Sequence, residues 1–223
     1  MKPEVQASAS PLELLELDAA KPENQIFDHP IWKAALDGTL PKPRLKKLLL
    51  AFYPVVAGPG RYAFAAKVSQ IDAQDGKELF LQLHEALKNP AADADAGWKK
   101  VLTALGATQR ELEAEPSAEA ADLVDVLREH GLRSGPVHAA VIAHMLEQHL
   151  PVLWGRLADS LSKHYGVKSE HLRHEGARAP QVKKWVAHLV EKYVAGADPY
   201  TVFEARRAAR EALWAWTALT ETV

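Results

Sequence analysis

The chain has 223 residues, which lies within the size range of one ordinary domain and is long enough to bury a large core. Hydrophobic residues make up 48% of it and charged residues 25%, with a formal net charge of -2, so intrinsic disorder is excluded and no nucleic acid or anionic membrane is expected as a partner. The sequence contains no cysteine, which excludes disulfides, zinc ribbons, iron–sulfur clusters held by thiolates, and cysteine nucleophiles.

The start of the sequence resembles neither a secretion signal nor a membrane anchor. Residues 1–20 lack a basic start followed by an apolar run, and no stretch of the chain approaches the roughly 20 apolar residues that span a bilayer. We therefore expect a cytoplasmic protein with one domain over 1–223, in which 1–20 form a partly flexible segment.

Apolar residues recur at helical spacing through most of the chain, and no strand-length alternation of β-branched and polar residues occurs. The predicted fold class is therefore all-α. Glycine and proline predict where helices end, for example at Gly106, Gly131 and Gly166. The predicted helical ranges are 11–18, 30–36, 42–56, 61–71, 76–88, 97–105, 118–129, 136–165, 181–195 and 199–220.

The longest pattern, 136–165, contains Pro151, which predicts a kink or a joint between two collinear helices. On its helical wheel, His144 and Glu147 fall on the same inward face. An imidazole and a carboxylate one turn apart can bind a metal, act as acid and base, or hydrogen-bond to each other. The sequence leaves these three alternatives open.

Other polar residues interrupt the apolar faces of the predicted helices. In 76–88, His84 borders the apolar line, whereas Glu85 lies toward the opposite side. In the last helix, Arg206 and Arg210 lie within or beside a broad apolar face that includes Phe203 and Trp214. Such arginines either extend to solvent or bind a buried anion.

The aromatic residues and histidines are assigned to the core, to a pocket or to the surface. Most tryptophans are expected in the core, and Tyr53, Tyr62 and Trp98 are bulky aromatic walls that could also line a pocket. His149 and His171 fall near helix ends or on polar faces, and we expect them at the surface.

Several motifs resemble one helical superfamily. The run Phe27–Trp32, read FDHPIW, followed by the turn Asp37–Leu40, is similar to the opening of the haem-oxygenase-like proteins, which include thiaminase II, the pyrroloquinoline quinone synthase and non-haem di-iron oxidases. The segment Phe52–Tyr62 resembles the iron-containing redox enzyme branch, and Glu147–Pro151 and Lys163–Val167 keep its order and spacing. The resemblance spans roughly residues 27–217.

This resemblance implies a bundle of about seven helices around a central pocket, often dimeric, whose members oxidise or cleave small molecules. Several members use two irons and dioxygen. Glu85 and Glu147 match the two glutamates of the di-iron branch, but the other expected ligand positions carry no ligand, and a thiaminase nucleophile is missing because the chain has no cysteine. The positions that lack the expected histidine or aspartate ligand are Ala94, Arg178, Val182 and Trp185. With a shifted register the last three positions are His174, Arg178 and Gln181, and two of these three still lack the expected ligand.

The leading hypothesis is a metal-independent or atypically metallated oxidase or oxygenase that acts on a small, anionic or partly aromatic biosynthetic molecule. The candidate acid–base residues are Glu147, His144, His84 and Glu85. The candidate substrate-binding residues are Tyr53, Tyr62, Arg178, Arg206, Arg210 and Trp98.

Two further hypotheses stay open. One is a non-catalytic scaffold that keeps the fold to bind a ligand or a partner enzyme, and the other is a remodelled iron site. The expected assembly is a homodimer or a complex with a partner enzyme. The residues that could form the remodelled iron site are His84, Glu85, His144, Glu147 and His174.

Overall fold

The computed structural model describes residues 10–57, 74–77, 93–132 and 134–223 of the chain. Within these ranges every regular element is a helix, and none of the residues forms a strand. The elements are α1 (Pro11–Ala19), η1 (Pro22–Asn24), η2 (Ile26–Asp28), α2 (Pro30–Leu36), α3 (Lys42–Val56), α6 (Ala94–Ala104), α7 (Gln109–Leu112), α8 (Ala118–Leu132), α9 (Pro136–Met145), η3 (Glu147–His149), α10 (Leu150–His164), α11 (Glu170–Ala177), α12 (Ala179–Tyr193) and α13 (Pro199–Glu221).

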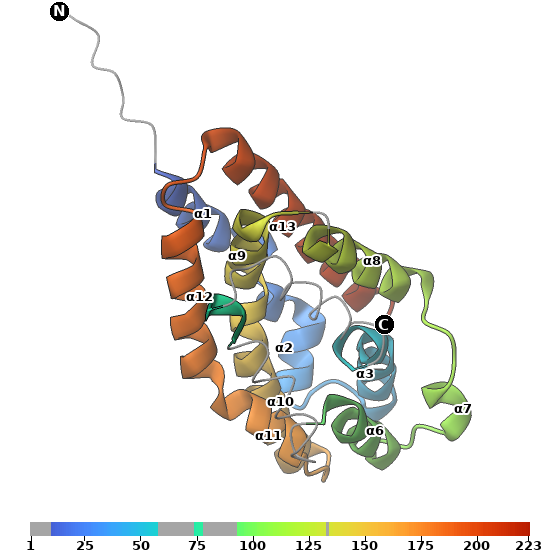
Figure 1. Ribbon diagram of the computed structural model, residues 1–223. Helices are drawn as coiled ribbons and strands as arrows, with labels where there is room; N and C mark the ends of the chain where they lie inside the picture. The colour runs from blue at the N-terminus through green and yellow to red at the C-terminus, as the bar shows by residue number, and fades with distance from the viewer. Residues whose placement is uncertain (1–9, 58–73, 78–92, 133) are drawn as a thin grey trace, which may run out of the picture.

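Helix α9 lies in the middle of the bundle, between α12 on one side and the long α13 on the other (Figure 1). It is buried on nearly every side, which is what a helix that is apolar all round requires. Helix α8 packs against both α13 and α3, α10 pairs with α11, and the first helix, α1, lies against α13. Residues 74–77 are helical and lie next to α12 (Figure 1).

The helix ends follow ordinary capping chemistry. The Ser10 side chain accepts a hydrogen bond from the Glu13 N–H, while the Glu13 carboxylate accepts one from the Ser10 N–H, which is a capping box. Gly106 and Gly166 end α6 and α10 in the left-handed region, at φ of 92° and 68°, which confirms their predicted role.

Most predicted helices are confirmed, and α2 and α3 match to the residue. The helix predicted to end at Glu129 runs on to Leu132. Two short helices, α7 and α11, were not predicted. The predicted helix 61–71 and most of 76–88 lie outside the described residues.

A cluster of large aromatic side chains fills the interior between α2, α3, α10 and α13. Trp216 packs against Phe52 with ring centroids 4.5 Å apart, and Trp32 lies 5.2 Å from Phe52. Trp154 joins the cluster and brings in Trp98 edge-on at 5.2 Å. Such contacts add to the burial of apolar area, so this cluster anchors the fold.

Helices α10 and α11 approach each other closely at a pair of glycines. A Cβ atom on Gly176 would lie 2.5 Å from the Cα of Gly155, so a side chain there would push the two backbones apart. No helix among the described residues is both long enough and apolar enough to cross a membrane.

Candidate functional site

The long helical pattern of 136–165 is interrupted between α9 and α10. At Leu146 the backbone leaves helical geometry, with φ of -124° and ψ of -60°, and the 3-10 turn η3 follows. Pro151 then occupies the first turn of α10, where its missing N–H costs no hydrogen bond. The predicted joint is therefore confirmed. His144 lies before it, in α9, and Glu147 and His149 lie in the 3-10 turn.

His144, in the last turn of α9, is the most distinctive group at this joint. Its side chain is 12% exposed, and its Nε2 atom is buried without a hydrogen-bond partner. The nearest acid is Glu16 of α1, whose Oε1 lies 3.7 Å from Nε2. Burial lowers the pKa of His144, although the charge of Glu16 opposes this shift, so the imidazole is neutral near pH 7.

The contact between Gln148 and His144 favours one tautomer of the imidazole. The Gln148 side-chain amide donates to the His144 carbonyl oxygen at 2.5 Å and also lies 3.4 Å from Nδ1. An amide N–H next to Nδ1 favours the tautomer in which Nδ1 accepts and Nε2 bears the hydrogen. His144 therefore presents a buried N–H donor at Nε2.

His149 was expected at the surface, but its side chain is partly buried and packs edge-on against Phe27, with ring centroids 5.7 Å apart. Burial lowers its pKa, and His144, when protonated, and the Lys183 ammonium act in the same direction. The wheel drawn for an unbroken helix missed this placement because the 3-10 turn rotates His149 toward the interior. Pro151 was the one available signal.

Glu147 is partly buried and lies in η3, whereas His144 belongs to α9. The unbroken helix predicted from the sequence placed both side chains on one face of one element. The structure instead places them on consecutive elements at the same joint. The acid–base hypothesis for this pair remains a prediction.

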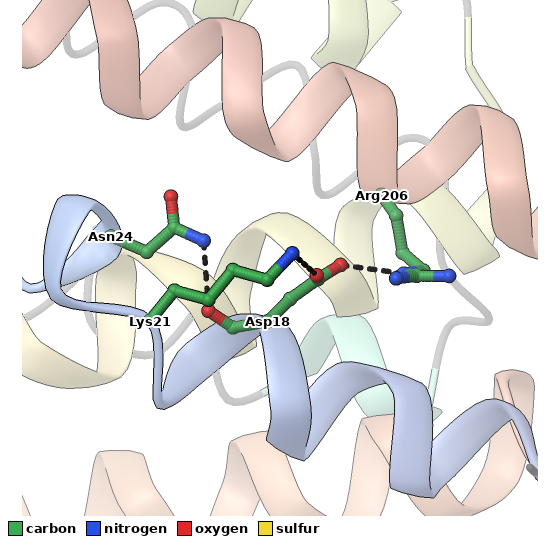
Figure 2. A network of polar contacts seen from close by, with 4 residues as sticks. All are labelled: Asp18, Lys21, Asn24 and Arg206. Atoms are coloured by element: carbon green, nitrogen blue, oxygen red, sulfur yellow. Dashed lines mark hydrogen bonds and ion pairs between the residues drawn. The ribbon is translucent and has the colours of Figure 1, made fainter.

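The candidate arginine Arg206 binds a buried anion, but that anion belongs to the chain itself. Its Nε donates to Oδ2 of Asp18 at 2.6 Å, and Lys21 donates to Oδ1 at 2.8 Å (Figure 2). Asn24 donates to the Asp18 carbonyl oxygen at 2.8 Å (Figure 2). Burial alone would raise the pKa of Asp18, but the hydrogen bonds from Arg206 and Lys21 outweigh it and lower that pKa.

The other two candidate arginines have different surroundings. Arg178 donates to Glu175 one turn earlier, at 3.3 Å, across the junction of α11 and α12. Arg210 is partly exposed on α13 and forms no hydrogen bond or ion pair with the described residues. Of the three, Arg210 keeps its donors available.

Tyr53 and Trp98 contact residues other than His144, Glu147 and His149. The Tyr53 hydroxyl donates to Asp95 at 2.5 Å, and burial followed by the adjacent Asp95 carboxylate raises its pKa to about 12. Tyr53 also borders an open groove of about 490 Å³ between α3 and residues 111–117. Trp98 is 1% exposed in the aromatic core. The candidates His84, Glu85 and Tyr62 lie outside the described residues.

A second polar cluster, which the sequence did not reveal, surrounds Asp75. This carboxylate is 5% exposed; its Oδ1 lies 2.8 Å from His188 Nε2, and its Oδ2 accepts from Lys192 and Tyr193 at 2.7 Å each. Burial would raise the pKa of Asp75, but these hydrogen bonds lower it to about 2. Its partners lie 113 to 118 positions along the chain, so no local pattern could have predicted the cluster.

Several positions at which the resemblance implies an iron ligand carry residues that do not bind iron. Among the residues that the structure describes, no group of three or more His, Asp or Glu side chains is arranged to hold a metal ion. Arg178 is paired with Glu175, and neither an alanine, a valine nor a tryptophan side chain is an iron ligand. We therefore derive no chemical step through iron.

Comparison with known proteins identifies the fold. No family model matches the sequence, and no curated protein matches it. Among solved structures, the TenA homologue protein from P. horikoshii OT3 matches with a TM-score of 0.59 and 18% sequence identity, covering 96% of this chain and 99% of that chain. At this identity the likeness concerns the fold alone, so the chain has the all-helical, haem-oxygenase-like fold of a TenA homologue, as expected from its motifs.

Proposed function

We propose that this chain is an enzyme that oxidises a small anionic molecule with dioxygen, using the joint between α9 and α10 as its acid–base site. In this scheme Glu147 removes a proton from the substrate. The Nε2–H of neutral His144 donates a hydrogen bond to the negative charge that develops on the substrate.

The observation that carries this proposal is the unpartnered Nε2 of His144. A buried polar atom without a hydrogen-bond partner costs free energy, so a native protein keeps one mainly where a ligand or water satisfies it. A neutral imidazole that donates is well suited to stabilise an oxyanion or enolate, because it can do so without first losing a charge. Gln148 supports this role by fixing the tautomer.

The electrons must balance in such a reaction. The substrate loses two electrons and two protons. Dioxygen takes up the two electrons and the two protons and becomes hydrogen peroxide. Glu147 holds one of these protons only transiently. The oxidase part of the proposal rests on the resemblance to oxidising members of the superfamily, and the acid–base part rests on the joint.

The test is oxygen uptake by the purified protein with a panel of quinone precursors and aminobenzoates. An active substrate should show uptake matched by peroxide formation, and His144→Ala and Glu147→Gln should each lower kcat by about 100-fold or more. Glu191→Gln, which changes an exposed glutamate on α12, is the matched control and should keep full activity. Activity retained in both joint variants would refute the assignment.

A non-catalytic scaffold is the second candidate, and one observation favours it. Arg206 and Arg178, which were expected to hold an anionic substrate, are engaged by the chain's own carboxylates. A scaffold should show no oxygen uptake with any compound of the panel, yet Glu147→Gln should leave its ligand or partner binding intact. Metal content measured by plasma mass spectrometry, after anaerobic ferrous reconstitution of untagged protein, tests the remodelled iron site.

A further inference from the structure

Helix α13 carries large aromatic side chains on a face that is exposed to solvent. Tyr200 is 72% exposed, Phe203 51% and Trp214 62%. Single exposed apolar residues are ordinary, but three aromatic rings on one face of one helix form a patch that marks an interaction surface. The opposite face of α13 already packs inward; its buried residues are Val202, Ala205, Ala208, Ala209, Ala212, Leu213, Trp216, Leu219 and Thr220.

The exposed residues are spaced as in a helix–helix seam. Positions 200, 203, 207, 210 and 214 alternate steps of three and four, the spacing at which one helix packs along another. On a helical wheel they fall within an arc of about 80° and extend about 21 Å along the axis. We call this set the outer stripe; its residues are Tyr200, Phe203, Arg207, Arg210 and Trp214.

The charges of the outer stripe are balanced by acids beside it. Arg207 lies 2.7 Å from Glu204 and 3.7 Å from Glu211, whereas Arg210 has no acidic partner among the described residues. The centre of the stripe thus has two cations and two anions between two aromatic ends. A centre with balanced charges gives an anionic membrane no net attraction, whereas membrane-surface helices carry mainly Lys and Arg on their polar face.

This arrangement is complementary to itself when reversed. An antiparallel copy of α13 places the Tyr200 and Phe203 end of one helix against the Trp214 end of the other, twice by symmetry. Aromatic pairs and arginine–aromatic pairs are both favourable there. Arg210 then meets the acidic centre of the partner, where it gains the ion pair that it lacks in one chain.

We propose that the outer stripe of α13 binds the same stripe of a second copy of this chain, with the two helices antiparallel. The interface is isologous, so each copy contributes the same residues. It is independent of the proposed oxidation, because no residue of the joint takes part. The aromatic ends supply the anchoring contacts and the charged centre fixes the direction of the helices.

The first experiment measures molar mass by sedimentation velocity over a wide range of protein concentration. The unmodified chain should dimerise, and Phe203→Glu combined with Trp214→Glu should raise the dimer Kd by about 100-fold or more. Val152→Glu, at an exposed apolar residue of α10 outside the stripe, is the matched control and should leave the Kd unchanged. Circular dichroism melting shows that each variant folds, since all three side chains point outward.

The second experiment tests the direction of the helices. Because the chain has no cysteine, single cysteines can be introduced without background. A short bis-maleimide should cross-link Arg207→Cys chains to each other, at the centre of the stripe, but not Ala218→Cys chains, at its end. A mixture of Tyr200→Cys and Trp214→Cys chains should cross-link as heterodimers.

Three results would overturn the proposal. They are a monomer at every concentration, a dimer that the Phe203→Glu and Trp214→Glu variant leaves intact, and equal cross-linking at positions 207 and 218. The last result would mean a parallel pair. A monomer that loses vesicle binding in the same double variant would assign the stripe to a lipid surface instead.

Discussion

Helix α1 presents two acids to two largely buried basic side chains, Arg206 and His144, and the outcomes differ. Asp18 faces α13, where both of its carboxylate oxygens accept hydrogen bonds, from Arg206 and Lys21 (Figure 2). Glu16, two residues earlier, is largely exposed and lies 3.7 Å from the Nε2 of His144, beyond hydrogen-bond distance. Both carboxylate oxygens of Asp18 are thus satisfied within the chain, whereas the Nε2 of His144 at the joint has no hydrogen-bond partner.

This difference separates structural from functional polar groups. A buried charge whose partners are all present holds the fold together, and removing one partner leaves an uncompensated charge. A buried neutral group with an unmet hydrogen bond contributes little to stability but can bind a ligand. The two clusters should therefore respond in opposite ways to mutation.

The largest expected effect is on the Asp18 cluster. Arg206→Ala leaves a carboxylate that is 2% exposed with only Lys21 to neutralise it, and should lower the free energy of unfolding by about 3 kcal/mol. Urea denaturation measures it. Arg128→Ala is the matched control, because that arginine pairs with Asp125 at 2.7 Å on the surface and should cost less than about 1 kcal/mol. Equal costs for both variants would contradict the interpretation.

The Asp75 cluster should behave like the Asp18 cluster, with a somewhat smaller effect. Asp75→Asn keeps the shape of the side chain but removes the charge that accepts from Lys192 and Tyr193, and should cost about 2 kcal/mol. The lowered pKa gives the pH dependence. This stability is present above the ordinary pKa of 3.8 and is lost as the pH falls toward about 2.

Acid titration of both proteins checks this prediction. The unmodified chain should lose the Asp75 contribution between those two values, and Asp75→Asn should show a shallower dependence of unfolding free energy on pH there. If the unfolding free energy of the two proteins changed equally with pH, Asp75 would not be the group responsible for the acid dependence.

The positions of most helices could be predicted from the sequence because they depend on local patterns of residues. Proline and glycine marked most ends, and the apolar spacing marked the faces. Helix α11 was missed because its residues, Glu170–Ala177, are mostly polar; it buries Leu172 and His171 through tertiary packing. His171, expected at the surface, is 5% exposed for the same reason.

The sequence did not show which residues form ion pairs with the charged side chains. Asp18 and Arg206 are 188 positions apart, so the sequence showed an arginine on an apolar face but not the anion it binds. Phe203 and Trp214 were grouped with inward residues of α13, yet both point outward, because α13 has a second apolar face. A helical wheel gives the direction of a side chain but not what lies in that direction.

The joint should be sensitive to milder acid than the carboxylate clusters. Burial lowers the pKa of His144 and His149 at the joint below the ordinary value, and it does the same for His138 in the first turn of α9. The unfolded chain therefore binds these protons more tightly than the folded chain, so stability is full above a pH of about 6.5 and falls as the pH drops below it. Thermal melting between pH 7.5 and 5, values chosen to bracket that ordinary pKa, should show a steadily falling Tm.

The matched variant for this titration replaces all three histidines with glutamine. Its Tm should depend less on pH over the same range, since the groups that take up protons are gone. The same slope in both proteins would assign the acid sensitivity to other groups.

The smallest effect on stability should come from His144→Gln. Its Nε2 makes no hydrogen bond in the protein, and Gln148 can still donate to the backbone carbonyl of residue 144. The substitution therefore removes only the long 3.4 Å contact between the Gln148 amide and Nδ1. The free energy of unfolding should change by less than about 1 kcal/mol, against about 3 kcal/mol for Arg206→Ala. Urea denaturation of the two variants side by side measures the difference. A loss of similar size in both would show that His144 is a structural group, and the joint would then lose the property that distinguishes it from the Asp18 cluster.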